Sequence, residues 1–160
     1  MREILFKAKA KGGSWIEGDL IRYENGQVAI LEKPFSKYGC EATEIVKRTE
    51  VIPETICQYT GLTDKNGNKI WENDIVNGHS NPNDLAKVVF GEFCVIEVGS
   101  LDKVDGVIGW HTEVIPTDDL SKCEPFCLPM PLTDFYIEIS EFEVIGNIFD
   151  NPELLKGGSV

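Results

Sequence analysis

The chain has 160 residues and a mass of 17.8 kDa; 42% of its residues are hydrophobic and 26% are charged. This composition is typical of a globular protein with one domain or two small ones, and it excludes a disordered chain. No apolar run approaches the ~20 residues of a membrane span, and the charged N-terminal sequence lacks the apolar core of a secretory signal. We therefore expect a cytoplasmic protein with no membrane partner.

The net charge of -12 is concentrated in the second half of the chain. Residues 1–52 hold nine Lys or Arg and eight Asp or Glu, whereas residues 53–160 hold six and nineteen. Between Glu113 and Asp150 there are nine acidic residues and one base, Lys122. Because binding to phosphates needs cationic side chains, this charge argues against nucleic-acid binding by the second half. It is compatible with a basic partner, including a protein that itself binds DNA.

Short strands are predicted throughout the first 52 residues. Residues 3–8, 15–23 and 28–31 have extended patterns, and Asn25-Gly26 predicts a type I′ hairpin turn between the last two. The β-branched residues within 41–52 predict a further pair of strands. Pro53 then coincides with the change in charge. We therefore predict an N-terminal β meander at residues 1–52 and a second domain at residues 53–160.

The second domain begins with a polar hairpin. Residues 64–68 (Asp-Lys-Asn-Gly-Asn) form its predicted tip, where the glycine suits the left-handed conformation. Two apolar runs, 87–90 and 93–98, predict another hairpin with Gly91-Glu92 as its turn. Residues 116–131 contain proline and acidic residues without a hydrophobic period, so we expect a surface excursion that is either disordered or faces a partner.

Two strands and a helical turn are predicted at the end of the chain. Residues 135–139 (Phe-Tyr-Ile-Glu-Ile) alternate as an edge strand does, and residues 143–149 predict the closing strand. Asn151 and Pro152 have the residue types of a helix cap and first helical position. The chain is thus predicted to be mainly β, with roughly eight to ten short strands at the spacing of small barrels or sandwiches.

No residue pattern predicts a catalytic, cofactor or metal site. Cys94, His111 and Glu113 would form a nucleophile–base–acid set only if the fold brought them together, and the apolar run around Cys94 favours an inert thiol. Cys123 and Cys127 lack the spacing of zinc and redox motifs, so we expect two loop thiols. We therefore predict no catalytic residue, no cofactor and no metal.

Three stretches of the sequence resemble a known family: residues 2–8, 55–76 and 143–155. The central stretch (TICQYTGLTDKNGNKIWENDIV) matches most fully, and together the three resemble the YopX family of small phage and prophage proteins. Cys57 and Asn73 depart from the pattern, which commonly has glycine at both positions; asparagine tolerates left-handed geometry. The matching residues are Gln58, Tyr59, Thr60, Gly61, Leu62, Asp64, Gly67, Trp71, Asp74, Ile75, Val76, Gly146, Asn147 and Pro152.

The resemblance implies a phage or prophage origin and a mainly β fold. It implies a small SH3-like barrel in residues 53–160, with additional N-terminal strands and a short C-terminal helical turn, or one compact domain overall. The family carries no established catalytic mechanism, so no catalytic residue is transferred. Each matching residue has a structural explanation as a turn, a cap or a close backbone approach, and we expect these residues to serve the fold.

We interpret the chain as a non-enzymatic accessory protein that binds a macromolecule. Its acidic surface favours a phage or host protein as the partner. The alternative is a nucleic-acid-binding module in the first half, where aromatic residues such as Trp15, Tyr23 and Tyr38 accompany Lys47 and Arg48 and could stack single-stranded bases. Edge strands also leave open a homo-oligomer, in which a second copy covers the exposed edge.

Overall fold

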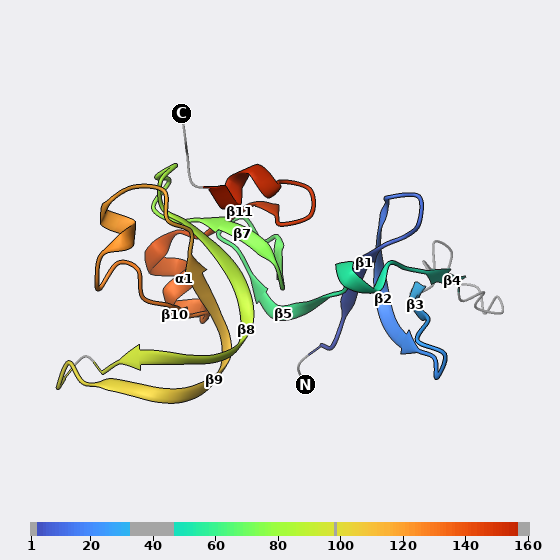
Figure 1. Ribbon diagram of the computed structural model, residues 1–160, viewed down its shortest axis with the longest axis horizontal. Helices are drawn as coiled ribbons and strands as arrows, with labels where there is room; N and C mark the ends of the chain where they lie inside the picture. Colours follow the sequence, from blue (N-terminus) through green and yellow to red (C-terminus); the bar gives the residue numbers. More distant parts are fainter. Residues whose placement is uncertain (1–2, 33–46, 98, 157–160) are drawn as a thin grey trace. The chain divides into compact units, whose positions relative to one another are not determined.

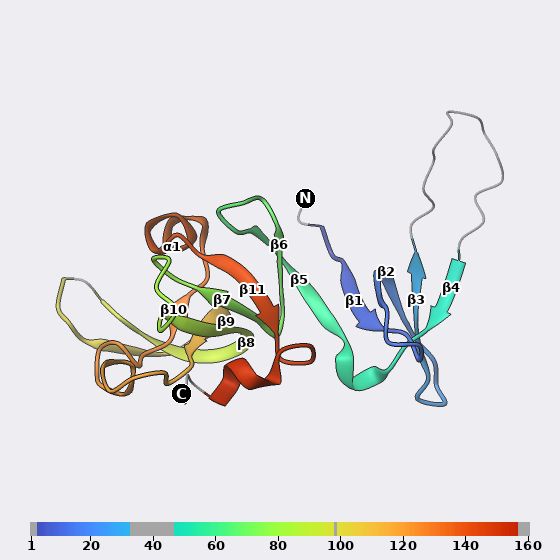
Figure 2. The ribbon, with the colours of Figure 1, turned by 90° about the horizontal axis from the view of Figure 1, so that it is seen from above.

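The computed structural model describes residues 3–32, 47–97 and 99–156 (Figures 1 and 2). The chain is mainly β, as predicted, and it divides into two compact units, Met1–Tyr59 and Thr60–Val160. Strand β5 (Cys57–Thr63) crosses the division, because its first residues pair with β1 and its later residues accompany β6. The domain boundary at Pro53 and the SH3-like barrel stay predictions.

The first unit is an antiparallel sheet in the order β4-β3-β2-β1-β5. Alternate side chains of its strands pack into a core around Ala8, Val28, Ile30 and Val51. Its remaining elements are β1 (Phe6–Lys9), β2 (Trp15–Arg22), β3 (Val28–Glu32), β4 (Lys47–Glu50) and the 3-10 helix η1 (Pro53–Thr55). The predicted strand pair within residues 41–52 lies partly outside the described residues, which resume at Lys47.

The predicted hairpin at Asn25-Gly26 is present, but its turn is of another type. Gly26 has a φ of 84°, whereas Asn25 is not among the residues with positive φ, so the loop is not type I′. The N–H of Gly26 donates to the carbonyl of Tyr23, and the N–H of Tyr23 donates to the carbonyl of Gln27. The same pattern of bonds closes the hairpins at residues 10–14 and 64–68.

The second unit contains a five-stranded antiparallel sheet in the order β10-β9-β8-β7-β11. Its main core joins Ile70, Val76, Val88, Ile137 and Phe142, so the helix and the strands bury their apolar side chains together. Its elements are β6 (Lys69–Trp71), β7 (Asp74–Asn77), β8 (Leu85–Ile96), β9 (Lys103–Val114), η2 (Leu120–Lys122), β10 (Met130–Pro131), α1 (Asp134–Ser140), β11 (Glu143–Asn147) and η3 (Pro152–Lys156).

Residues 135–139, predicted as a strand, form most of helix α1 instead. The side chain of Thr133 caps the helix by accepting a hydrogen bond from the N–H of Tyr136 (3.2 Å). Phe135 and Ile139 are exposed, whereas Ile137 is buried. The alternation of apolar residues therefore does not reflect two faces of a strand. The Thr133 cap and the burial of Ile137 stabilise the helix instead.

The predicted hairpin turn at Gly91-Glu92 is also wrong. β8 runs without interruption through both apolar runs, and Gly91 lies opposite Gly109 of β9. The two strands turn farther along, where the N–H of Glu97 donates to the carbonyl of Asp102 (3.0 Å) and Leu101 has a φ of 63°. Glycine in a strand interior marks a bend or a close approach as often as a turn.

Asp64, at the hairpin tip, is buried and joins two distant parts of the chain. Its Oδ1 accepts hydrogen bonds from the backbone N–H groups of Asn66 and Asn68, both at 2.9 Å. Its Oδ2 accepts from the Nδ2 of Asn68 (3.1 Å) and from the N–H of Val144 (3.0 Å). Burial raises the pKa of the Asp64 carboxyl, but the hydrogen bonds outweigh burial and hold the pKa below its ordinary value. The carboxylate therefore links the hairpin tip to β11.

Asparagine side chains hold the turn that follows β11, at residues 146–151. The Oδ1 of Asn147 accepts from the N–H groups of Phe149 and Asp150, both at 3.0 Å. A Cβ on Gly146 would lie only 2.8 Å from the Cγ of Asn151, so glycine is needed for the Asn151 side chain to lie against β11. The predicted helical turn follows as the 3-10 helix η3.

We predict that Asp64→Asn lowers the free energy of unfolding by about 2 kcal/mol, because an amide nitrogen would replace one acceptor and face buried N–H donors. Urea denaturation followed by circular dichroism measures the change. The matched control is Asp105→Asn, the same substitution at an exposed position of β9, for which we expect a change within about 0.5 kcal/mol. Equal stability of the Asp64→Asn variant and the parent would contradict the stabilising role of the Asp64 carboxylate.

The same carboxylate predicts a pH dependence. Because its pKa is lower in the folded state, its contribution is complete above the unfolded-state value of about 3.9 and is lost as pH falls through the folded-state value. We expect the stability difference between the parent and Asp64→Asn to be constant near neutral pH and to shrink below about pH 4. Urea titrations across this range measure it, and a difference that grows on acidification would rule out a lowered pKa.

Candidate functional site

The second unit carries the whole net negative charge of the protein. Residues 60–160 contain six lysines and eighteen Asp or Glu, whereas residues 1–59 contain nine residues of each sign. Four of the six lysines lie within 3.0–3.1 Å of an acidic side chain: Lys65–Glu143, Lys87–Glu113, Lys103–Glu124 and Lys122–Asp119. Such surface pairs add little stability. Because eighteen acidic residues accompany only six lysines, the field around this unit is negative.

A pocket of about 360 Å³ lies in the second unit, against the segment 116–131 that the sequence predicted to be a surface excursion. Residues 118–130, drawn as an orange loop in Figure 1, form one side of it. The loop at 78–84, strands β8 and β9, and the end of α1 with Phe142 supply the rest. This hollow, the 118–130 pocket, therefore joins parts of the chain that are distant in sequence.

Apolar side chains supply much of the lining of the 118–130 pocket. Ala86, Leu128 and Phe142 are among them, and Ala86 and Phe142 also belong to the main core of the unit. Leu120 and Phe126 line the pocket as well, although 57% and 55% of their surfaces are exposed. Exposed apolar side chains next to an apolar hollow are typical of a site that a partner covers.

His79 and Asp84 form a polar pair in the lining. The Nδ1 of His79 lies 2.8 Å from the Oδ2 of Asp84. His79 has a φ of 52°, and its N–H donates to the carbonyl of Ser140 (2.7 Å), which ties the loop to the end of α1. A Cβ on Gly78 would lie 3.0 Å from the Cγ of Asp84, so glycine makes room for the carboxylate across the loop.

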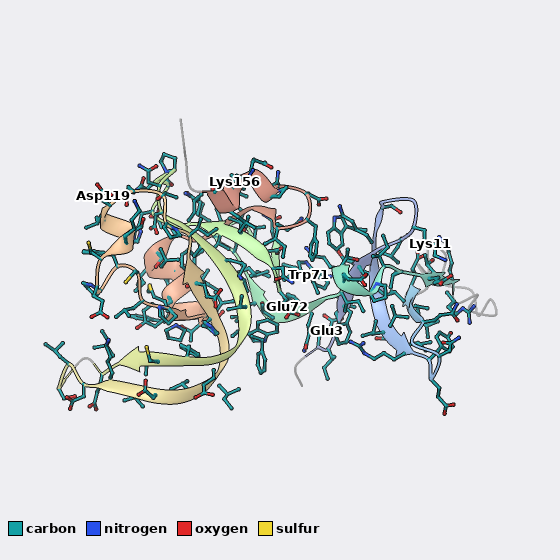
Figure 3. All side chains as sticks on the ribbon, in the orientation of Figure 1. Glu3, Lys11, Trp71, Glu72, Asp119 and Lys156 are labelled. Carbon is teal, nitrogen blue, oxygen red and sulfur yellow. The ribbon has the colours of Figure 1, made fainter. Side chains whose placement is uncertain are left out.

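Asp118 is the second carboxylate of the lining. Its Oδ1 accepts a hydrogen bond from the N–H of Ser121 (2.8 Å), and the Ser121 hydroxyl accepts from the N–H of Thr117 (3.0 Å). The backbone and side-chain hydrogen bonds of Ser121 hold the pKa of Asp118 below its ordinary value. Asp119, labelled in Figure 3, lies on the same segment and pairs with Lys122 (3.1 Å). This side of the pocket is therefore charged.

Cys94, His111 and Glu113 do not come together as a catalytic set. His111 lies opposite Val89 in the ladder of β8 and β9, so Cys94 is roughly 16 Å farther along β8 at the rise of a strand. His111 is buried and stacks on Phe93, with 4.3 Å between ring centroids. Its Nδ1 lies 3.2 Å from the carbonyl oxygen of Gly109. The imidazole is thus packed into the sheet.

The described cysteines are free thiols. Cys57 is buried, Cys94 and Cys127 are half-buried, and Cys123 is exposed with its Sγ 3.3 Å from the carbonyl oxygen of Asp119. Within residues 3–32, 47–97 and 99–156, no three His, Cys, Asp or Glu side chains are grouped so that they could hold a metal ion. In the same ranges, no helix combines the length and the apolar character of a membrane span.

The residues of the family pattern lie elsewhere than the 118–130 pocket, and none of them lines it. Most of them lie on β5, β6, β7 and β11. There the Thr60 hydroxyl donates to the carbonyl of Ile70 and the N–H of Trp71 donates to Asp74 Oδ2, both at 2.8 Å. Figure 3 labels Trp71 on β6. Asn73, where the pattern commonly has glycine, has a φ of 65°. This left-handed conformation explains the preference for glycine there.

A comparison with known families identifies the family of the chain. A family model described as YopX protein matches residues 6–156, nearly the whole chain. The chain belongs to the YopX family. The resemblance drawn from three short stretches is thereby confirmed. A search of curated proteins found no match.

Sequence reasoning missed several residues of the pocket in this YopX protein. The Asn, Pro and Asp residues of the stretch 79–84 are typical of turns and indicate only a loop. The pairing of His79 with Asp84 has no signal in the sequence beyond their five-residue separation. Residues 116–131 were predicted as a disordered or partner-facing surface excursion, but the apolar hollow beneath them depends on strands and a helix that lie far away in sequence.

Proposed function

We propose that this YopX-family protein is a non-enzymatic accessory protein of phage or prophage origin that acts in the cytoplasm by binding a basic segment of a phage or host protein. The 118–130 pocket is the observation that supports this function best. It combines an apolar lining with the carboxylates of Asp84 and Asp118. It also lies in a unit whose acidic residues outnumber its lysines three to one, eighteen against six.

The chemistry of the pocket fits one kind of ligand. An apolar side chain of the partner would displace water from the hollow and cover Leu120 and Phe126, which are exposed in the free protein. A lysine or arginine beside that side chain would meet Asp84 or Asp118. The negative field of the unit would speed the encounter with a basic segment and make the association sensitive to salt.

The hydrogen bonds of the polar residues favour binding over catalysis. The Ser121 hydroxyl donates to the carbonyl of Asp118 (2.9 Å) and accepts from backbone N–H groups, so its bonds are those of a tight turn. A serine nucleophile would instead contact a base. The backbone of His79 is tied to Ser140, and the ring of His79 is paired with Asp84. These contacts shape the pocket.

We propose in addition that the residues of the family pattern stabilise the fold and do not contact the partner. Their side chains and backbone groups bond within β5, β6, β7 and β11, and Asp64 joins the central stretch to the terminal one. An Asp64→Asn variant at a temperature where it remains folded would then bind a partner with the affinity of the parent. A large loss of affinity in that folded variant would place these residues at the binding surface.

Selection from a library of short random peptides on the intact protein tests the proposed function. We expect the selected peptides to carry an apolar residue next to lysine or arginine, and to bind about tenfold more weakly when salt is raised from about 50 to 200 mM. Leu120→Ser and Phe126→Ser should each weaken binding about tenfold or more, the range of an apolar contact residue. Leu155→Ser, a matched change at an exposed apolar residue outside the pocket, should leave the affinity unchanged.

Three outcomes of the peptide selection would contradict the proposal. The first is the failure to enrich any peptide at low salt. The second is enrichment of acidic peptides, and the third is enrichment of peptides whose affinity is the same for the Phe126→Ser variant and the parent. Both the variants and the Leu155→Ser control change exposed side chains, so urea denaturation can confirm that all three keep the stability of the parent.

One observation favours the second candidate, nucleic-acid binding by the first unit. The ammonium groups of Lys7 and Lys9 lie 5.0 and 5.4 Å from the ring centroid of Trp15, a basic and aromatic surface of the kind that stacks single-stranded bases. Of the other residues that motivated this alternative, Tyr38 lies outside the described residues. Arg48 donates to the Tyr23 hydroxyl (2.7 Å).

A mobility-shift assay at low salt distinguishes the two candidates. If the second holds, single-stranded probes are retarded and Trp15→Ala abolishes the shift, because each stacked base contributes about 1–3 kcal/mol. The control is Leu155→Ser, which alters an exposed residue of the second unit and should leave the shift unchanged. We expect no shift with single- or double-stranded probes, and a shift that depends on Trp15 would replace the first proposal.

A further inference from the structure

The hairpin of β8 and β9 extends beyond the strands that flank it. β7 pairs with β8 only at Leu85–Lys87, and β10 pairs with β9 only at His111 and Thr112. Among the described residues, the outer edges of 89–96 in β8 and 103–109 in β9 have no strand partner. Figures 1 and 2 both show this stretch, the β8–β9 arm, leaving the rest of the unit as two strands. A two-stranded ribbon is marginally stable alone, and its open edges can pair with another chain.

One face of the β8–β9 arm carries exposed apolar side chains. Phe90 lies opposite Trp110, and Ile108 lies two residues from Trp110 on the same face of the ladder. Phe90 and Ile108 are 54% and 70% exposed. Phe90 and Trp110 pack edge to face with ring centroids 5.1 Å apart, and Trp110 packs against the main core of the unit. The apolar surface thus begins at the core and continues into solvent.

The two edges of the β8–β9 arm differ in regularity. The register shifts between Phe93 and Val95 because β9 has one residue more than β8 in this stretch, next to Gly106 with a φ of 79°. A bulge of this kind bends a strand and interrupts its edge. The edge of β8 is continuous from 89 to 96, so it is the better template for an added strand.

A pair of glycines leaves room on the opposite face of the β8–β9 arm. Gly91 lies opposite Gly109, so neither strand places a side chain there. A Cβ on Gly109 would meet no atom within 4 Å, and the nearest atom to a Cβ on Gly91 would be in the His111 ring at 3.9 Å. Paired glycines let the ribbon bend and adapt to a backbone that approaches it.

The charge of the β8–β9 arm determines which occupant fits. Glu92, Glu97, Asp102 and Asp105 lie on the arm or its turn, and the one lysine of the arm, Lys103, pairs with Glu124 (3.0 Å). A second copy of the protein would bring the same excess of acidic residues to the contact, and like charges across paired strands are unfavourable. A basic segment would instead be attracted.

We propose that the β8 edge of the arm adds a strand from a basic partner protein. The added segment is extended and alternates apolar residues with lysine or arginine. Its backbone pairs with residues 89–96, and its apolar side chains lie on the face of Phe90 and Ile108. Its cations, which the alternation places on the opposite face, are attracted by the acidic residues of the arm and its turn. This inference rests on the proposed function and gives it a second contact, separate from the 118–130 pocket.

Binding of three short synthetic peptides to the intact protein, measured by calorimetry and by backbone amide NMR shifts, tests this inference. The first alternates Val and Lys, the second alternates Val and Glu, and the third is the first with N-methyl groups on alternate residues of one edge. We expect the Val-Lys peptide to bind and to shift the amides of 89–96. The Val-Glu and N-methylated peptides should bind at least about tenfold more weakly, because one loses charge complementarity and the other loses backbone hydrogen bonds.

Substitutions on the arm locate the contact. Phe90→Ser, Ile108→Ser and Glu92→Lys should each weaken the Val-Lys peptide several-fold, while Leu155→Ser and the pocket variant Phe126→Ser should not. Amide spectra of each variant confirm that the fold is kept, since all these side chains are exposed in the free protein. If the binding of library-selected peptides depends on Phe126 alone, the proposed function stands, but the proposed strand addition at the β8–β9 arm is wrong.

Three results would overturn the inference. The Val-Lys peptide could fail to bind at low salt, or the N-methylated peptide could bind equally well, which would exclude pairing of backbones. Sedimentation could instead show a dimer that Phe90→Ser and Ile108→Ser dissociate, in which case a second copy occupies the arm. If neither library peptides nor the Val-Lys peptide bind, the proposed function and the inference fail together.

Discussion

The buried carboxylate of Asp64 is the contact on which the second unit depends. Residues 64 and 144 are eighty positions apart, and one hydrogen bond of 3.0 Å joins them. A charged group at this depth is tolerated only because four donors surround it, two from the backbone of its own turn, one from the Asn68 side chain and one from β11. The local turn is therefore completed only when the end of the chain is in place.

The residues of the YopX family pattern lie apart from the surfaces that we propose bind a partner. The family pattern includes places where strands distant in sequence are joined: the carboxylate of Asp64 binds β11, and Asp74 of β7 lies opposite Asn147 of β11. The 118–130 pocket and the β8–β9 arm lie on segments outside that pattern. Strands that are joined by buried hydrogen bonds, with loops and a projecting hairpin around them, are a common arrangement for binding, because loops tolerate change that buried hydrogen bonds do not.

Local chemistry made much of the fold predictable. The hairpins at Asn25-Gly26 and Asp64–Asn68 followed from glycine and asparagine, whose conformational preferences act within a few residues. The errors arose where two local structures were equally allowed. Residues 135–139 could alternate as a strand or turn as a helix, and the Thr133 cap with burial of Ile137 decided it. Gly91 could end a strand or bend one, and its position opposite Gly109 decided that.

The sequence by itself determined the family, the mainly β class, the excess of acid in the second half and the polar turns, since each is carried by residue type or by neighbours along the chain. Only the tertiary structure decided that Asp84 and Asp118 line one hollow with Phe142, and that Phe90 and Ile108 form a single apolar face. The physical reason is register. Which side chains meet across strands depends on pairings between residues far apart in the chain, and a shift of one position would reverse every face.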